Sequence, residues 1–268
     1  MNRVLPVHSF GEAIETNLFS YFPFFSKLPG VDHHEDPAIM WSVTDIAYPL
    51  FNCILGARIQ APDVDTVIEG IIARGRSKKV PLLWWIGPDS QPADLADALI
   101  RHGFGHEANV PGMAADLFAL NETLPMPPGL VITQVQDADS LNTWCRTAAA
   151  GFEMPAFAAQ AWHDWYLRIG LSPQVPLYHY IGWQHGRPVA SATLWSSGGV
   201  AGIYNVATVA NARRQGIASI MNLELLRCAR SIGCRVGVLH ASSMGVGVYQ
   251  RLGFKEYCRI GHYLWSPE

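Results

Sequence analysis

A proline-rich segment divides the chain into two halves. Residues 121–129, NETLPMPPG, hold three prolines and one glycine in nine positions. Proline lacks a backbone N–H and fixes φ, so this composition favours an extended connection over a helix or a strand. The flanking stretches, residues 1–120 and 130–268, are each long enough to form a domain with its own core. We therefore expect two domains joined by a linker at residues 121–129.

The second half alternates strand patterns and helix patterns. Apolar runs and turn signals predict one strand, two helices, three strands, a helix, a strand, a short helix and a last strand. Asp137 or Asp139 is expected to cap the first of these helices. The strands fall at residues 130–135, 178–183, 188–196, 200–209, 235–240 and 257–265, and the later helices at 156–168, from 217 onward, and at 245–252. This order predicts an α/β domain with a mixed sheet.

The first half repeats part of this order. Its patterns predict a helix at residues 65–74, a strand at 80–86, a helix at 92–102 and a strand at 113–120. The strings LIRHGF (99–104) and YQRLGF (249–254) share an arginine and a Gly-Phe pair at the same offsets. A short match within a shared order of elements indicates two copies of one fold.

The most specific motif lies between a predicted strand and a predicted helix. Residues 209–218 read VANARRQGIA, and Gly216 allows a backbone conformation that other residues resist. The N–H groups of such a loop and of the helix N-terminus can converge on an anion such as pyrophosphate. The residues alone leave open an ordinary strand-to-helix turn with two solvated arginines.

A second motif follows in residues 241–257, where a short predicted helix leads through Gly-Phe into another strand. With both motifs the chain resembles the GNAT-superfamily N-acetyltransferases. Arg213-x-x-Gly216-x-Ala218 matches the family's acyl-CoA pyrophosphate loop, and Tyr249-x-x-Leu252-Gly253-Phe254 matches its C-terminal helix-to-strand motif. The resemblance covers residues 130–268 and implies the acyl-CoA N-acyltransferase (GNAT) fold, with two GNAT-like domains in tandem. The first half keeps Gly-Phe but shows no glycine loop, so it looks like a degenerate copy.

The resemblance implies that the second half binds acetyl-CoA as a cosubstrate and needs no metal. Backbone groups at the end of the third strand would pair with the pantetheine arm, and the glycine loop would hold the pyrophosphate. Ser242 stands where the family often has an asparagine near the cofactor. The expected cofactor-binding residues are Ala207, Thr208, Val209, Arg213, Arg214, Gln215, Gly216, Ile217, Ala218, Ser219, Ser242 and Tyr249.

Tyr249 is the expected general acid. A phenol can give a proton to the thiolate that leaves when an amine attacks a thioester. The alternative is a core aromatic residue, because Gly245, Tyr249 and Leu252 share helical spacing.

The general base is not evident from the sequence. Some family members use a glutamate on the third strand, but residues 200–209 contain no carboxylate. Glu153 and His240 are possible substitutes, and an amine of low pKa could instead lose its proton to water. Phe152, Glu153 and Asn205 are the expected substrate contacts. Phe157, Trp162, Trp165 and Tyr166 follow in the next helix, either to enclose an apolar acceptor or as core.

Composition limits the remaining classes. The chain of 268 residues is 49% hydrophobic and 15% charged, with a formal net charge of −3, which argues against disorder and against a nucleic-acid or membrane partner. Five cysteines without CxxC spacing fit reduced thiols in the cytoplasm, and no signal peptide is indicated at the beginning. We expect the acidic and histidine-rich residues 32–36 to form a solvated turn rather than a metal site. The basic residues 74–79 are expected to end a helix.

Together these features predict a cytoplasmic N-acetyltransferase, monomeric or homodimeric. It would move an acetyl group from acetyl-CoA to a primary amine of a small molecule or peptide by direct attack. The alternative is a non-catalytic acyl-CoA-binding sensor or scaffold.

Overall fold

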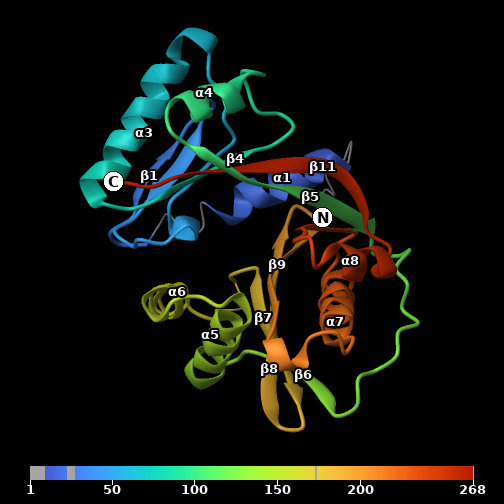
Figure 1. Ribbon diagram of the computed structural model, residues 1–268. Coiled ribbons are helices and arrows are strands. Elements are labelled where there is room, and N and C mark those ends of the chain that lie inside the picture. The colour runs from blue at the N-terminus through green and yellow to red at the C-terminus, as the bar shows by residue number, and fades with distance from the viewer. Residues whose placement is uncertain (1–9, 23–27, 173, 268) are drawn as a thin grey trace. The chain divides into compact units, whose positions relative to one another are not determined.

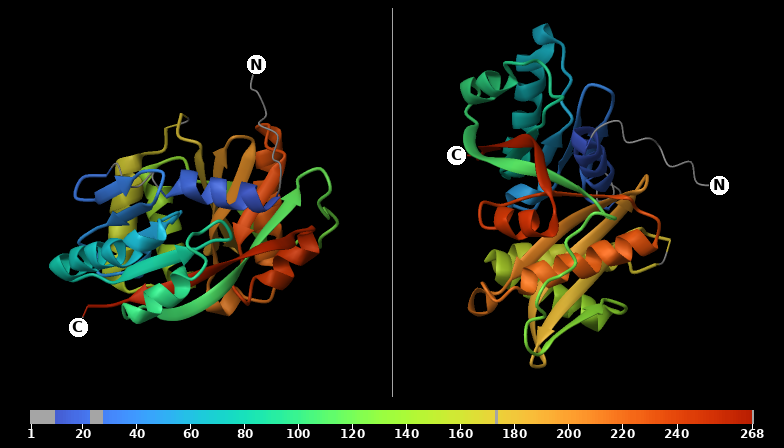
Figure 2. Two further views of the ribbon diagram at one scale, coloured as in Figure 1. Left: turned by 90° about the horizontal axis from the view of Figure 1, so that it is seen from above. Right: turned by 90° about the vertical axis from the view of Figure 1, so that its right-hand side faces the viewer.

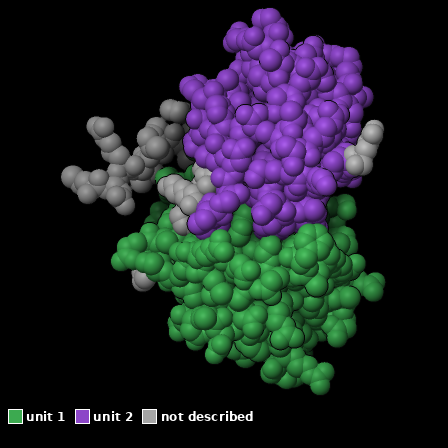
Figure 3. Space-filling view, turned by 90° about the vertical axis from the view of Figure 1, so that its left-hand side faces the viewer, with its two compact units in different colours: residues 1–21, 112–257 green, residues 22–111, 258–268 purple. Residues whose placement is uncertain are grey.

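The computed structural model describes residues 10–22, 28–172 and 174–267 (Figure 1). Two compact units divide the chain (Figure 3): unit 1 comprises residues 1–21 and 112–257, and unit 2 comprises residues 22–111 and 258–268. Each unit therefore contains two separate segments, whereas the sequence predicts continuous halves. Residues 121–129 contain no helix or strand and lie within unit 1.

Unit 1 is built on a sheet with the strand order β5, β10, β9, β8, β7, β6. Its strands are the end of β5 (Gly105–Asp116), β6 (Leu130–Gln134), β7 (Leu177–Gln184), β8 (Arg187–Ser197), β9 (Val200–Thr208) and β10 (Val236–His240). The strands β6 to β9 pair antiparallel with their neighbours, whereas β10 pairs parallel with β9 and antiparallel with β5. The sheet is therefore mixed, as predicted.

Helices cover both faces of this sheet (Figures 1 and 2). One face carries α5 (Ala138–Phe152), α6 (Ala156–Ile169) and α1 (Phe10–Tyr21), and the other carries α7 (Ile217–Ser231) and α8 (Val246–Leu252). Successive side chains of β8 point to opposite faces of the sheet and so contact different helices. Ala192 and Leu194 join the core under α7, while Thr193 and Trp195 bond to residues of the α1 and α5 side.

Local signals fix the helix boundaries of unit 1. Asp137 accepts from the Ser140 N–H at 2.8 Å, and the Ser140 side chain bonds back, which completes a capping box at the start of α5. Pro155 precedes α6, and Gly216, with φ of 82°, precedes α7. The predicted elements of the second half are therefore confirmed.

Unit 2 contains a second sheet segment in the order β1, β2, β3, β4, β11, β5. Its elements are β1 (Asp32–Glu35), β2 (Met40–Val43), β3 (Cys53–Leu55), α3 (Val64–Lys78), β4 (Leu82–Ile86), α4 (Leu95–Arg101), the beginning of β5 and most of β11 (Lys255–Trp265), with short 3-10 helices at Pro49–Phe51 and Ala61–Asp63. Its core packs Trp84, Leu99 and Phe104 beneath the helices. The β3–β4 pair is parallel, and the β4–β11 pair is antiparallel.

Two strands belong to both units. β5 begins in unit 2 and its residues Met113–Asp116 pair with β10 of unit 1, whereas β11 begins in unit 1 and its residues Gly261–Trp265 pair with β4 of unit 2. Strand β5 ends the first half of the sequence and completes the sheet of unit 1, whereas β11 ends the second half and completes the sheet of unit 2.

Two expectations need correction, and one helix is missing from the sequence analysis. Residues 32–36 are not a turn: β1 spans Asp32–Glu35 and pairs with β2, because Gly30 and Asp36 place turns at either side of it. The strand expected at residues 113–120 begins earlier, at Gly105, and ends at Asp116. Helix α1 is not predicted from the sequence at all, because its buried Glu15 and Asn17 interrupt the apolar pattern.

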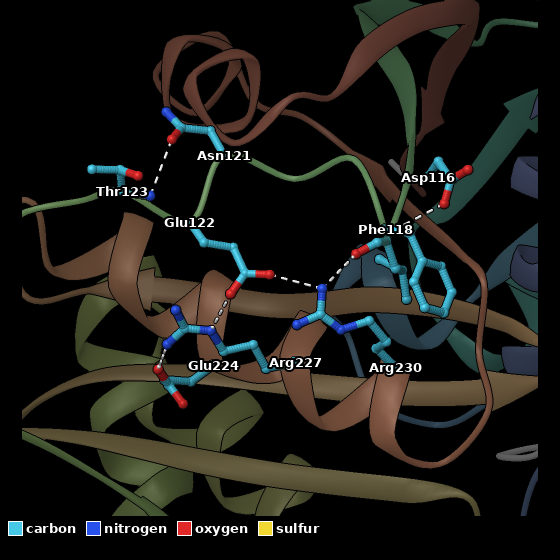
Figure 4. Close-up of polar contacts among 9 residues, drawn as sticks. Asp116, Phe118, Asn121, Glu122, Thr123, Glu224, Arg227 and Arg230 are labelled. Atoms are coloured by element: carbon cyan, nitrogen blue, oxygen red, sulfur yellow. Dashed lines mark hydrogen bonds and ion pairs between the residues drawn. The ribbon is translucent and has the colours of Figure 1, made fainter.

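Ion pairs connect the linker at residues 121–129 to α7 (Figure 4). Glu122 accepts from Arg227 Nε at 2.9 Å and from Arg230 Nη1 at 2.7 Å, and Arg230 also donates to the Leu117 carbonyl. The Arg230 and Arg227 hydrogen bonds lower the pKa of the Glu122 carboxyl. The proline-rich segment is thus held along unit 1 at defined points.

The Glu122 cluster predicts a pH-dependent contribution to stability. A carboxyl whose pKa is lowered on folding stabilises the protein above its unfolded pKa, and the contribution fades as pH falls below about 4.5. Glu122→Gln is expected to lower the free energy of unfolding at pH 7 by about 1 kcal/mol or less, since the groups are partly exposed. Urea unfolding of the wild type and of Glu122→Gln at pH 7 and at pH 3.5 measures this difference in the free energy of unfolding. A difference that persists undiminished at the lower pH contradicts it.

Candidate functional site

The site begins where two parallel strands part. β9 and β10 pair only from Val200 and Val236 to Gly202 and Val238. Beyond this point β9 continues to Thr208 and β10 continues to His240 without pairing with each other, although each stays paired with its other neighbour. The edge of β9 that faces β10 is therefore open along its second half, and an extended ligand can add to it as a strand does.

A β-bulge lies at the start of this open segment. The β8–β9 register shifts between Ser191 and Thr193, which oppose Ala207 and Tyr204. Asn205 takes a left-handed conformation there, with φ of 53°. Its carbonyl accepts from Ser191 Oγ at 3.1 Å. In a trans peptide the C=O and the next N–H point in opposite directions, so the Val206 N–H points away from β8, toward the open edge.

The register decides which further backbone groups face the open edge. The Val209 N–H donates to the Val189 carbonyl at 2.9 Å, and Ala207 opposes Ser191, so both residues direct their backbone groups to β8. Thr208 lies between these two residues, so its backbone groups point the other way, toward the open edge. Its carbonyl accepts there from Arg213 Nε at 3.0 Å. Of the three expected pantetheine partners, Thr208 is therefore the one whose backbone faces that edge.

The glycine loop ends in an uncapped helix N-terminus. Gly216, with φ of 82°, is the N-cap residue of α7, and no side chain caps the helix there. The first turn holds no acidic residue. A Cβ at Gly216 would meet only Pro127 Cγ, at 3.8 Å, so the approach to the first N–H groups of α7 is open. Such an N-terminus suits an anion such as a phosphate group.

The other loop residues have distinct environments. Ile217 and Ser219 are buried at the start of α7, and Ala218 is half-buried between them. Arg214 is exposed, with φ of 63°. Gln215 is exposed and accepts from Gln184 Nε2 at 3.1 Å.

Arg213 links the loop to the end of α5. Its guanidinium donates to the Gly151 carbonyl at 2.9 Å and lies 3.4 Å from the Glu153 carboxylate. Glu153 ends α5 in a left-handed conformation, and its side chain is 75% exposed. Phe152 beside it is exposed and approaches the Trp162 ring at 6.2 Å.

Tyr249 is buried beneath α8. It belongs to the core of unit 1, and its ring meets Phe254 edge-on at 6.0 Å. Burial raises the pKa of its phenol, so the residue stays protonated at neutral pH, as a proton donor must. Gly245 and Ser242 border it: a Cβ at Gly245 would lie 2.9 Å from the Tyr249 ring and 3.4 Å from Ser242 Oγ. The structure places the Tyr249 ring in the core, and its acid role stays a prediction.

Four side chains that sequence analysis did not group together converge on the bulge. Asn205 Nδ2 lies 3.2 Å from the Tyr21 hydroxyl, 2.9 Å from that of Tyr166 and 3.2 Å from that of Thr193. The two tyrosine hydroxyls lie 3.0 Å apart. We call Tyr21, Tyr166, Thr193 and Asn205 the Asn205 cluster. Asn205 was an expected substrate contact, and Tyr166 was expected either to enclose an acceptor or to form core. The Asn205 amide nitrogen is engaged by these hydroxyls.

The Asn205 cluster offers no group that takes a proton at neutral pH. Burial raises the pKa of Tyr21 to about 12 and that of Tyr166 well above its usual range. His179, which bonds to Thr193 Oγ1 at 2.9 Å, is held neutral because burial lowers its pKa to about 3. The cluster is therefore a set of neutral hydrogen-bonding groups.

The corresponding helix of unit 2 differs at its N-terminus. α3 carries Asp65 in its first turn and Asp63 at its N-cap. Asp65 is already bonded to His102 at 2.8 Å. Carboxylates at this end repel a phosphate, so the α3 terminus does not fit a pyrophosphate as the α7 terminus does.

The search for metal-binding and membrane-spanning features covers the described residues only. Within residues 10–22, 28–172 and 174–267, no group of three His, Cys, Asp or Glu side chains is placed to hold a metal ion. Over the same ranges, none of the helices has the length and apolar character needed to cross a membrane. The five cysteines are free thiols.

A mixed sheet whose central parallel strands part beside a bulge and an open helix N-terminus defines the fold class of the acyl-CoA N-acyltransferases. Residues 139–254 match the model of the Acetyltransferase (GNAT) family. This part of the chain is a GNAT domain. No curated protein matches the sequence.

Solved structures extend the fold likeness to the whole chain. A GCN5-related N-acetyltransferase from Kribbella flavida is similar with a TM-score of 0.74 and 18% identity, over 97% of each chain. A tandem GNAT protein from the clavulanic acid biosynthesis pathway is similar with a TM-score of 0.61 and 11% identity, over 95% of this chain and 87% of its own. A GCN5-related N-acetyltransferase from Sphaerobacter thermophilus is similar with a TM-score of 0.61 and 15% identity, over 85% of this chain and 76% of its own. The expected GNAT fold is confirmed, and the likeness to a tandem GNAT protein covers both halves of the chain.

Proposed function

We propose that the protein is an acyl-CoA-dependent N-acyltransferase that moves an acetyl group from acetyl-CoA to a primary amine of a small molecule or peptide. One observation carries the proposal: the parted strands β9 and β10 lie in the same unit as the open N-terminus of α7. The GNAT domain at residues 139–254 supports acyl transfer from acetyl-CoA in general.

The residues of unit 1 divide the work of binding. The first N–H groups of α7, at Ile217, Ala218 and Ser219, would hold the pyrophosphate, with Arg214 as an additional cation. Thr208 and Val206 would pair with the pantetheine arm along the open edge of β9. Acetyl-CoA supplies the thioester, whose carbonyl the Val206 N–H would polarise.

The proposed transfer is a direct attack. A C–N bond forms, the C–S bond breaks, the amine loses a proton and the sulfur gains one. We assign the proton for sulfur to Tyr249. Glu153 has an exposed carboxylate paired with Arg213, which suits an amine contact better than a base. The amine proton therefore passes to solvent in this scheme.

Calorimetric titration with acetyl-CoA and with desulfo-CoA tests the binding step. Micromolar affinity for both is expected, because the pyrophosphate contacts do not involve the thioester. A panel of primary amines, followed by release of free thiol, then tests the chemistry. Binding with no turnover of any amine would favour a non-catalytic acyl-CoA sensor or scaffold, and no binding of either compound would remove both functions.

Tyr249→Phe is expected to lower kcat by about tenfold or more while the affinity for desulfo-CoA stays within about twofold. The substitution removes the proton donor but keeps the ring that packs on Phe254. Initial rates of thiol release and calorimetry on the same preparation check it. Tyr180→Phe is the matched control, because Tyr180 is also buried in the core of unit 1 but bonds to Cys228. Equal rates for wild type and Tyr249→Phe would contradict the acid role.

A further inference from the structure

Tyr21 reaches the site from a distant part of the sequence. It is the last residue of α1, 184 residues before Asn205, yet its hydroxyl lies 3.2 Å from Asn205 Nδ2. Its side chain is only 6% exposed. Its ring stacks on that of Tyr204 at 4.1 Å, with 8° between the planes. Tyr21 is therefore fixed in place and is too buried to touch an acceptor.

The last turns of α1 are anchored independently of Tyr21. Asn17 Nδ2 donates to the Val200 carbonyl at 3.3 Å, and Asn17 Oδ1 accepts from the Tyr204 hydroxyl at 2.8 Å. Trp195 Nε1 donates to Ser20 Oγ at 2.9 Å. These bonds tie the end of α1 to β8 and β9 on one side of the bulge, so they set where the Tyr21 hydroxyl lies.

The Asn205 cluster stabilises a backbone conformation that is otherwise unfavourable. A non-glycine residue with positive φ costs about 1 kcal/mol, and asparagine tolerates it best. Three hydroxyls hold the Asn205 side chain, and Ser191 holds its carbonyl. The peptide that joins Asn205 to Val206 is thereby restrained through the side chain and the carbonyl of Asn205, and its N–H is aimed at the open edge of β9.

We propose that Tyr21 is a positioning residue for acetyl transfer: from helix α1 it restrains Asn205, and through Asn205 the direction of the Val206 N–H. The inference rests on the proposed function, since it assigns that N–H to the thioester carbonyl. It makes the N-terminal helix a working part of the GNAT domain, although the family match begins at residue 139.

Isotope-edited infrared spectroscopy of acetyl-CoA with a ¹³C-labelled thioester carbonyl tests the inference without any acceptor. In the wild type the bound carbonyl band is expected to lie at lower frequency than in free acetyl-CoA, because a hydrogen bond weakens the C=O bond. Tyr21→Phe is expected to lose about half of this displacement, and kcat with an amine substrate to fall about tenfold, with unchanged affinity for desulfo-CoA. Tyr180→Phe, which removes a buried hydroxyl that bonds to Cys228 and not to the Asn205 cluster, is expected to keep the displacement.

Variants of Asn205 test whether Tyr21 acts through this residue. Asn205→Gly is expected to keep more of the displacement than Asn205→Ala, since glycine adopts positive φ freely. Tyr21→Phe in the Asn205→Gly background is expected to cause no further loss. If Tyr21→Phe does not fold, Tyr166→Phe removes the paired hydroxyl and is judged by the same criteria.

The outcomes separate the two proposals. If the wild type does not bind acetyl-CoA, the proposed function fails and the inference fails with it. Two results overturn the inference while the proposed function stands, provided that the wild type binds acetyl-CoA. In the first, Tyr21→Phe shows the full displacement of the carbonyl band. In the second, Tyr21→Phe causes the same loss in the wild type and in the Asn205→Gly background.

Discussion

Gly216→Glu is expected to abolish measurable acetyl-CoA binding while the protein remains folded. The substitution places a carboxylate at the open N-terminus of α7, where the pyrophosphate is proposed to bind. Two like charges about 4 Å apart near a protein surface repel by about 4 kcal/mol. A loss of affinity of at least about 100-fold follows, since each 1.4 kcal/mol is about tenfold. Calorimetric titration with acetyl-CoA and with desulfo-CoA measures it.

Gly198→Glu is the matched control for Gly216→Glu. Gly198 also has positive φ, 58° against 82° for Gly216, and a Cβ there would meet nothing within 4 Å. Both variants carry the same added charge and a backbone strain of about 1–2 kcal/mol. They should therefore lose similar thermal stability, and only Gly216→Glu should lose affinity. Equal affinities would mean that the α7 terminus does not bind the cosubstrate.

Gly202→Ala is expected to destabilise the protein by about 3 kcal/mol. Gly202 is buried in β9 opposite α1, and a Cβ there would overlap Asn17 Oδ1 and the Tyr204 ring. The last turns of α1 must then move off the sheet. Urea unfolding followed by circular dichroism measures the change. Gly70→Ala serves as the control, because its Cβ would meet only Arg74 Nη1 at 3.7 Å within a helix.

The pair Gly202→Ala and Asn17→Ala tests the cause. Asn17→Ala alone loses the bonds to Val200 and Tyr204, but in the Gly202→Ala background it removes the colliding Asn17 atoms and leaves only the Tyr204 ring. The double variant is therefore expected to be more stable than Gly202→Ala, an interaction between the sites of at least about 1 kcal/mol. Strict additivity would show that the contact with α1 is not what excludes a side chain at residue 202.

Much of unit 1 is predictable because its signals are local. The Asp137 capping box, Pro155 before α6 and Gly216 before α7 each act within a few residues of an element's end. The glycine loop is likewise a short segment whose residues all follow one strand. Sequence reasoning could therefore locate the loop that we propose binds the cosubstrate, and the structure shows that it leads into an uncapped helix N-terminus.

The exchange of strands is not predictable in this way. The strand pattern of residues 257–265 indicates a strand but not its partner, and β11 pairs with β4, where Gly261 opposes Ile86. Nothing local distinguishes that pairing from one within the second half. The division into units consequently differs from the continuous halves that the proline-rich segment suggested.

The Asn205 cluster shows the same limit within the site. Tyr166 has the spacing of a core aromatic residue, and Tyr21 lies in a helix whose apolar pattern is broken by Glu15 and Asn17. Their hydroxyls meet across 145 residues of sequence. The hydrogen bonds to Asn205, rather than any motif, reveal that the two tyrosines meet at one residue.

The sharing of β5 and β11 has a consequence for synthesis on the ribosome. Residues 22–111 are made early, but their sheet lacks β11 until residues 258–268 have been added. Throughout the synthesis of unit 1, the edge of β4 that β11 later covers exposes N–H and C=O groups to other nascent chains. Slow translation or truncation near residue 257 should therefore favour aggregation through this edge, even though the residues of unit 1 are already complete.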